Sequence, residues 1–331
     1  MLSPARWLIV AVFAAWCALA HAATDTVLVI ESYHKEFAWD ASYRQAISDK
    51  LSPRYAVEFF EMNTKRLPAA EHQKMAAKAL ARIEQLRPAL IILGDDAALS
   101  HLGTTIDKLG IPAVYLGINN NPRLYNEGRV FKHITGVLER PLIKRNIAFI
   151  RQIVPDARRI LVLFDKDLTS TIIGSELFYG RKSVFIEGIE VVFQQHGTYF
   201  AWQTAVSEAK SDGFQAIFAG LYQSLKQDDG TIANPEAVIT WSSQKTPVPL
   251  FGFWDFAIGP DKAIGGLVCS GKEQGEAAAD IALRIIERGE SVSSIVPRTA
   301  PQGHLVFSRK QLSRFSLTLP AAQEKHAHWV D

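Results

Sequence analysis

The sequence has few cysteines, no run of basic residues and only one long apolar stretch. Cys17 and Cys269 are its two cysteines, and Cys17 lies in an N-terminal stretch that we expect to be removed. The mature chain would keep one cysteine and form no intramolecular disulfide, so packing must hold the fold together. The formal net charge is +2, and without a basic run nucleic acid binding is not expected.

Motifs of several enzyme classes are also missing. The chain has no Gly-x-Ser-x-Gly elbow, no His-Glu-x-x-His helix and no complete Gly-x-x-x-x-Gly-Lys-Ser/Thr phosphate loop. No Gly-x-Gly-x-x-Gly follows the first expected strand, so a dinucleotide is not the expected ligand. The histidines are scattered, apart from a weak His326-x-His328 pattern. We expect no enzyme, cofactor or metal; a hydrolase that uses Asp95 or Asp96 as a base is the enzymatic alternative.

The one long apolar stretch has the layout of an export signal. Arg6 precedes an apolar run from Trp7 to Leu19, and Ala20-His21-Ala22 follows as a small-x-small cleavage sequence. A membrane-spanning helix needs roughly 20 apolar residues, so this run is too short to span comfortably. We predict that residues 1–23 are a signal peptide and that the mature protein is exported to the periplasm.

Short apolar runs alternate with helical patterns along the rest of the chain. One helix is expected from Ala69 to Leu86, where apolar residues recur at three- and four-residue spacing before Pro88. The runs expected to be strands are Val27–Ile30, Leu90–Leu93, Val114–Leu116, Leu161–Phe164, Ile217–Ala219 and Leu250–Phe253. Alternating strands and helices predict an α/β fold with mostly parallel sheets.

Polar or aromatic residues follow each of these runs. In open parallel sheets, ligands bind in the crevice at the carboxyl ends of the strands. The candidate ligand-binding residues are Ser32, Tyr33, Asp95, Asp96, Asn119, Asp165, Tyr222, Trp254 and Asp255. Carboxylates and amides there can hold ammonium or hydroxyl groups, and aromatic faces can sandwich a ring, an aliphatic stem or a cation.

The candidates also have structural alternatives. Ser32 can cap the helix that follows it. Tyr222 and Trp254 can belong to the core. For the adjacent acids, we expect that either Asp95 or Asp96 caps the next helix while the other faces the crevice. Two buried, ionised carboxylates this close together are disfavoured, because their repulsion raises the pKa of one of them.

Segments along the whole mature chain carry a resemblance to a known family. They are Ser32-Tyr33-His34, Phe37-Ala38-Trp39, Met62-Asn63-Thr64-Lys65-Arg66, Asp95-Asp96-Ala97-Ala98-Leu99, Gly117-Ile118-Asn119, Phe253-Trp254-Asp255 and Gly271-Lys272-Glu273-Gln274-Gly275. In this order they resemble the extracytoplasmic substrate-binding proteins of ABC transporters and related sensor domains of bacterial histidine kinases. The resemblance implies a type I periplasmic-binding-protein fold, with two doubly wound, Rossmann-like lobes joined by a hinge.

The resemblance also implies a division of the chain and a function. Lobe one would comprise residues 24–135 plus 264–291, lobe two residues 136–263 plus 292–320, and residues 321–331 would be a flexible tail. The protein would be a periplasmic monomer that captures a small polar or zwitterionic ligand and delivers it to an ABC permease in the inner membrane. The alternative is a sensory ligand-binding subunit that docks on a membrane histidine kinase or cyclase.

Overall fold

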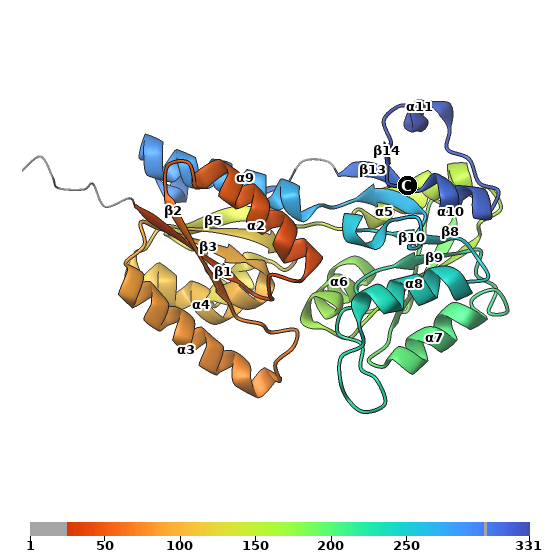
Figure 1. Ribbon diagram of the computed structural model, residues 1–331, viewed down its shortest axis with the longest axis horizontal. Helices are drawn as coiled ribbons and strands as arrows, with labels where there is room; N and C mark the ends of the chain where they lie inside the picture. Colours follow the sequence, from red (N-terminus) through yellow and green to blue (C-terminus); the bar gives the residue numbers. More distant parts are fainter. Residues whose placement is uncertain (1–24, 301–302) are drawn as a thin grey trace, which may run out of the picture.

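The computed structural model describes residues 25–300 and 303–331, which form two α/β lobes side by side (Figure 1). This is the two-lobed, doubly wound architecture that the family resemblance implies. The expected signal peptide, residues 1–23, lies outside the described residues. Among the residues that are described, no helix is long and apolar enough to cross a membrane.

Lobe one is built on a six-stranded sheet in which every neighbouring pair is parallel. Its order is β12-β5-β4-β3-β1-β2. The strands are β1 Thr26–Glu31, β2 Ala56–Glu61, β3 Leu90–Gly94, β4 Ala113–Ile118, β5 Ile134–Leu138 and β12 Arg298–Thr299. Helices cover both faces of this sheet, as Figure 1 shows. They are α2 Ala38–Leu51 and α9 Gly271–Arg288 on one face, and α3 Ala69–Leu86 and α4 Asp95–Leu109 on the other.

The burial pattern explains why some of these strands could be predicted from the sequence. In β1, Val27 and Val29 pack toward α2 and α9, whereas Leu28 and Ile30 pack toward α3 and α4. A parallel strand covered on both faces is a continuous apolar run. The edge strand β2 is only partly buried, and Glu58 and Glu61 interrupt its apolar residues, so it was not predicted.

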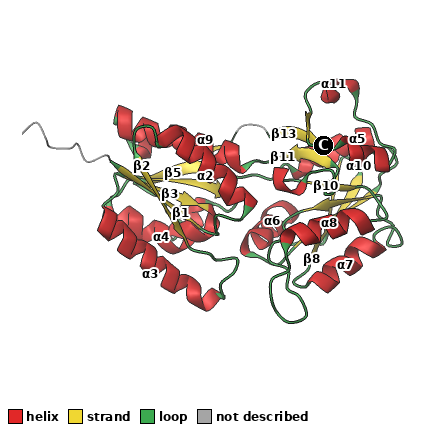
Figure 2. Cartoon of the chain, viewed as in Figure 1, coloured by secondary structure: helices red, strands yellow, loops and turns green. Residues whose placement is uncertain are grey.

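Lobe two contains a five-stranded sheet of order β10-β9-β6-β8-β7, and β7 runs antiparallel to β8. The strands are β6 Arg159–Phe164, β7 Ser183–Ile186, β8 Ile189–Gln195, β9 Ala216–Ala219 and β10 Leu250–Gly252. The helices are α5 Ile143–Ile153, α6 Leu168–Phe178, α7 Tyr199–Glu208 and α8 Pro235–Lys245. Figure 2 shows that helices lie outside the strands in this lobe as well.

A small third sheet is attached to lobe two. It consists of β11 Gly265–Val268, β13 His304–Phe307 and β14 His328–Trp329, in the order β11-β13-β14, and is accompanied by α10 Arg309–Arg314 and α11 Ala321–Glu324. Asp331 fastens its end, because its carboxylate accepts hydrogen bonds from Ser308 Oγ at 2.8 Å and from the amide of Arg309 at 2.7 Å. The end of the segment 321–331 is therefore attached to the third sheet by strand pairing and hydrogen bonds and is not the expected flexible tail, although none of its residues is buried.

The strand pairings place two segments differently from the expected lobe boundaries. β12 was assigned with residues 292–320 to lobe two, but it pairs with β5 in the sheet of lobe one. β11 was assigned with residues 264–291 to lobe one, but it pairs with β13 and contacts β10. We therefore propose revised lobes: residues 25–138 with 271–299, and residues 143–268 with 304–331.

Two glycines let α9 approach α2 closely. A Cβ at Gly275 would lie 2.6 Å from the carbonyl oxygen of Tyr43, and one at Gly271 would lie 2.5 Å from that of Trp39. These neighbours are backbone atoms, so they cannot move away unless the whole helix shifts. The glycines thus set how α9 holds the beginning of α2, where Trp39 and Tyr43 lie.

We predict that Gly275→Ala lowers the melting temperature, although alanine favours helix more than glycine does. The new methyl group overpacks the contact between α2 and α9, at a cost of about 1–3 kcal/mol. Lys272→Ala, on the exposed side of α9, is the control and should change stability by no more than about 0.5 kcal/mol. Thermal denaturation followed by circular dichroism measures both. A wild-type melting temperature for Gly275→Ala would show that the close approach is not required.

Candidate functional site

Two adjoining cavities lie between the lobes. The inner chamber has a volume of about 20 Å³ and is lined by Tyr33, Phe37, Trp39, Lys65, Asp95, Glu139, Thr169, Leu221, Trp254 and Phe256. The outer cavity has a volume of about 510 Å³, and its lining includes His34, Arg66, Tyr222, Gln223, Asn234 and Glu236. Phe37, Lys65 and Phe256 line both spaces. Both lobes therefore contribute side chains to one continuous site.

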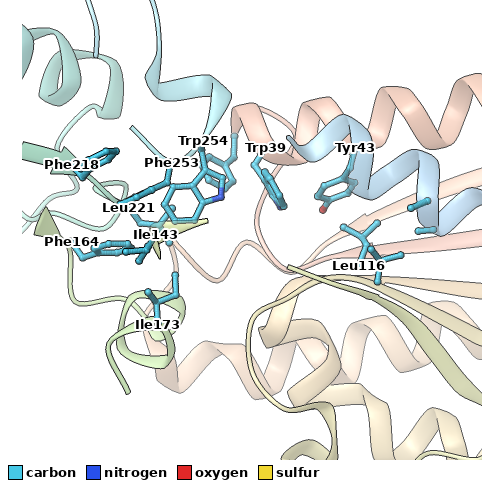
Figure 3. Close-up of a cluster of buried hydrophobic side chains, with 14 of the residues drawn as sticks. Trp39, Tyr43, Leu116, Ile143, Phe164, Ile173, Phe218, Leu221, Phe253 and Trp254 are labelled. Carbon is cyan, nitrogen blue, oxygen red and sulfur yellow. The ribbon is translucent and has the colours of Figure 1, made fainter. Parts of the chain in front are cut away.

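Aromatic side chains form most of the wall of the inner chamber. Tyr33 and Phe37 meet edge to face with ring centroids 5.3 Å apart, and Trp254 stacks with Phe256 at 6.2 Å. Phe37 of lobe one is 5.8 Å from Phe256 of lobe two. Figure 3 shows Trp39 and Trp254 entering the same region from opposite lobes. Such a wall suits an apolar body or a cation, since aromatic faces attract positive charge.

Each of the two carboxyls of the chamber is held by an indole. Trp39 Nε1 donates to Asp95 Oδ2 at 3.1 Å, and Trp254 Nε1 donates to Glu139 Oε1 at 2.6 Å. Asn119 Nδ2 donates to Glu139 Oε2 at 2.9 Å. Asp95 also has a φ of +68°. A non-glycine residue in this region is strained, and such strain is concentrated at binding sites.

Burial raises the pKa of both carboxyls. The pKa of Glu139 rises to about 7 by desolvation, although the hydrogen bonds from Trp254 and Asn119 act to lower it. The pKa of Asp95 lies well above its usual range because of desolvation and then repulsion from Asp40 and Glu139. The chamber therefore favours neutral carboxyls until a cation enters it.

Polar contacts between the lobes close the chamber. Lys65 follows β2 of lobe one, and Asp167 lies at the beginning of α6 in lobe two. Lys65 Nζ donates to Asp167 Oδ2 at 2.6 Å. Only 3% of the Lys65 side chain is exposed. The hydroxyls of Tyr33 and Thr169 are 3.2 Å apart and form a second contact between the lobes. The described conformation is therefore a closed one.

Four of the nine candidate residues line the cavities. Tyr33, Asp95 and Trp254 line the inner chamber, and Tyr222 lines the outer cavity. Tyr222 is also packed against Trp202 in the core of lobe two, with ring centroids 6.0 Å apart. Their roles in ligand binding remain predictions, but the structure brings these four side chains to one site.

Ser32 joins strand ends and does not line either cavity. Its hydroxyl donates to the carbonyl oxygen of Gly94 at 2.5 Å and accepts from the amide of Ala98 at 2.8 Å. Ser32 therefore satisfies an amide in the first turn of α4, and not in the helix that follows it in the sequence. This places β1 firmly against the beginning of α4, where Asp95 lies.

Asp96 supports the neighbouring loop. Its Oδ2 accepts from the amide of Asn119 at 3.0 Å, and its Oδ1 accepts from the Tyr125 hydroxyl at 2.9 Å. The expectation that one of the two acids caps a helix is not met, because α4 begins at Asp95 itself and its N-cap is Gly94. Of the adjacent pair, Asp95 is the one that lines the chamber.

The last two acidic candidates lie elsewhere. Asp165 is buried, and its carboxylate accepts from Ser170 Oγ at 2.5 Å and from the amide of Ser224 at 3.0 Å. It therefore organises the loops at the ends of β6 and β9. Asp255 lines a separate hollow together with His304. Asn119, described above, positions Glu139 and is absent from both cavity linings.

The sequence analysis missed several residues that line the chamber. The charged ones are Lys65 and Glu139. Lys65 follows the half-buried edge strand β2, and Glu139 follows the short strand β5. Neither strand was predicted, so neither residue was recognised as lying at a strand end. If β2 and β5 had been recognised as strands, Lys65 and Glu139 would have been identified as residues at strand ends.

Comparisons with known proteins agree with this arrangement. A family model described as ABC transporter substrate binding protein matches residues 61–330. No curated protein sequence matches the chain significantly.

Solved structures are similar over most of the chain. An ABC domain from Streptococcus pneumonia in complex with L-Trp has 16% identity and a TM-score of 0.68, covering 93% of this chain and 100% of that one. A ligand-free, open substrate binding protein from Clostridium difficile has 13% identity and a TM-score of 0.63, covering 93% and 99%. An arabinose binding protein from Geobacillus stearothermophilus has 16% identity and a TM-score of 0.59, covering 88% and 99%. At these identities the similarity shows the fold, which is type I periplasmic-binding-protein-like.

We expect the wild-type protein to lose stability as the pH rises from about 4.5 to about 7. We predict that Glu139→Gln makes this loss smaller. In that window folded Glu139 keeps a proton that the unfolded chain has already released, since its pKa rises from 4.5 to about 7. Folding therefore weakens as the pH rises, and a glutamine removes this contribution. Urea denaturation across the range measures it, and Glu127→Gln on the surface is the control. If the free energy of unfolding of Glu139→Gln falls with pH as steeply as that of the wild type, Glu139 does not have the raised pKa.

We predict that Lys65→Met favours an open form of the ligand-free protein. The change leaves Asp167 without its cation in the closed interface, and opening the lobes returns that carboxylate to water. Small-angle X-ray scattering should show a larger radius of gyration. Lys262→Met, which removes a pair with Glu236 at 2.8 Å within lobe two, should not change it. Equal radii for wild type and Lys65→Met would mean that this ion pair does not hold the lobes together.

Proposed function

This chain belongs to the ABC transporter substrate-binding protein family, and from that premise we propose that it captures a small polar or zwitterionic molecule and delivers it to an ABC permease. The proposal places the protein in the periplasm as a monomer. The observation that carries it is a chamber that both lobes line and that contacts between the lobes close. The family is one of substrate-binding proteins and not an enzyme class, and the proposal needs no catalytic step.

The charges around the site favour a zwitterion. Asp95 and Glu139 line the inner chamber, where a ligand ammonium group meets carboxylates and aromatic faces. Lys65 lies at the junction of the two cavities, where a ligand carboxylate can compete with Asp167 for its ammonium group. The inner chamber has room only for the head group of the ligand, and the outer cavity accommodates the remaining part of the molecule. L-Trp, which the Streptococcus protein binds, has this chemistry and is the first candidate.

Hinge closure is the proposed mechanism. The ligand first contacts one lobe of the open protein and then gains contacts from the other lobe when the protein closes. Only contacts that differ between the two states shift the equilibrium toward closure. A micromolar dissociation constant corresponds to about −8 kcal/mol, so a few buried polar contacts and aromatic faces are sufficient.

A thermal-shift screen of amino acids, nucleosides, sugars and small organic acids tests this proposal. A metabolite at 100 times its dissociation constant should stabilise the protein by about 2.7 kcal/mol. Trp254→Ala should remove the shift, because it deletes a chamber wall and the donor to Glu139. Phe200→Ala, an exposed aromatic residue on α7, is the control. The proposal is wrong if no metabolite shifts the wild type, and the site is wrong if Trp254→Ala binds normally.

A further inference from the structure

The sheet of lobe two ends in a strand whose outer edge is unpaired. β7 is joined to β8 by a tight turn at Glu187 and Gly188, which both have a positive φ. It is the last strand in the order β10-β9-β6-β8-β7, so no strand pairs with its other side among the described residues. The backbone donors and acceptors on such an edge can pair with another chain.

The register of the β7–β8 pair shows which backbone groups of β7 point outward. The amide of Phe193 in β8 donates to the carbonyl oxygen of Lys182 at 2.8 Å. Along an antiparallel strand, residues that bond to the neighbouring strand alternate with residues whose N–H and C=O point away from it. Counting from Lys182, the backbone groups of Val184 point toward β8, and those of Ser183 and Phe185 point outward. These outward groups have no hydrogen-bond partner among the described residues.

A groove beside β7 leaves this edge uncovered. It has a volume of about 330 Å³, and its lining includes Ile143, Leu177, Tyr179 and Phe185. The two aromatic residues are 68% and 77% exposed, respectively. None of the residues that line the groove lines either of the ligand cavities. Exposed apolar side chains along an unpaired strand indicate a partner, because such an edge otherwise favours aggregation.

The charges at the two ends of β7 complement each other. Arg181 and Lys182 precede the strand, and Glu187 follows it. All three side chains are exposed, and none forms an ion pair with another described residue. An antiparallel copy of the same strand brings its acidic end to the basic end of the first. A second copy of this chain therefore matches the edge in strand direction and in charge, whereas an anionic membrane surface would repel Glu187.

We propose that two copies of the protein pair through β7 in antiparallel direction, with Val184 opposite Val184 of the partner subunit. In this register Ser183 lies opposite Phe185, and the two residues exchange both of their backbone hydrogen bonds. Arg181 lies opposite Glu187, and the two-fold symmetry repeats each of these contacts. A shift of the register by two residues keeps backbone bonding but separates Arg181 from Glu187. The charges thus select one register.

The contact is small, so the pairing is weak. β7 has four residues, and interfaces that bury less than about 1,200 Å² belong mostly to transient complexes. Single copies therefore predominate at low concentration. This inference goes beyond the proposed function, in which one copy binds and delivers the ligand. Because the groove is separate from the ligand cavities, both copies of a dimer keep an unobstructed site.

Sedimentation velocity of the mature protein, from micromolar to submillimolar concentration, tests the pairing. The wild type should show an equilibrium between monomer and dimer. Arg181→Glu should weaken the dimer about tenfold or more, because it replaces two attractions across the strands by two repulsions. Glu187→Arg should do the same, and the double variant Arg181→Glu/Glu187→Arg should dimerise like the wild type. Lys210→Glu, a charge reversal at another exposed position, is the control and should change nothing.

Three results of these measurements would overturn the proposal. They are a wild type that stays monomeric at the highest concentration, a dimer that the single reversals leave unchanged, and a double variant that does not recover. Binding of a monomeric wild type to vesicles that contain phosphatidylglycerol would assign the edge to a membrane surface instead. The proposed function is unaffected by these outcomes, since Arg181→Glu should keep any thermal shift that a ligand causes.

Disulfide formation tests the register. Val184→Cys is combined with Cys269→Ser, so that residue 184 carries the thiol of the mature chain. Opposite residues that do not bond to each other have Cα atoms about 4.5 Å apart, which a disulfide can span. Mild oxidation should therefore give a covalent dimer. Ile186→Cys in the same background is the control, because it would lie four residues, or roughly 13 Å, from its counterpart. Equal dimer yields from both variants would show that the register is wrong.

Discussion

The closed structure depends on burying charged groups where the two lobes meet. Lys65 and Asp167 come from different lobes and form an ion pair in which the Lys65 side chain is 3% exposed and the Asp167 side chain 24%. A buried ion pair contributes little net stability, but either member is costly when it is left alone. Closure is therefore specific in geometry without being strongly favourable, which is what a binding protein requires if its ligand is to decide between the open and closed states.

The same constraint explains how the carboxyls of the chamber are arranged. Asp95 and Glu139 each accept a hydrogen bond from a tryptophan indole, and these indoles come from opposite lobes. Indoles supply a donor without adding charge, so they orient the carboxyls and leave them able to attract a cation. Glycines in α9 hold the beginning of α2 in place, so Trp39 meets Asp95 from a rigid element. The site is thus organised mainly by the packing of helices behind it.

The central strands could be predicted because they are covered on both faces. β1, β3, β4, β6 and β9 are continuous apolar runs, and their ends gave Tyr33, Asp95 and Tyr222 as candidates that line the cavities. β2 is a partly buried edge strand whose apolar residues are interrupted by Glu58 and Glu61, and it was missed together with Lys65. The lobe boundaries failed at β11 and β12 for a related reason. Strands of two to four residues are defined by the strand with which they pair. The local sequence does not indicate that partner.

The sequence by itself determined the α/β class, the central strands and the edge at which a ligand would be held, because parallel strands bring their carboxyl ends to one side of a sheet. Only the tertiary structure decided which atoms face the chamber. Asp95 and Asp96 are adjacent, but Asp95 has a φ of +68°, so its side chain leaves the backbone in a different direction from that of Asp96. One therefore faces the space between the lobes while the other binds the amide of Asn119. Burial, orientation and partner charge are properties of the packed chain, and they separate two residues that the sequence presents as equivalent.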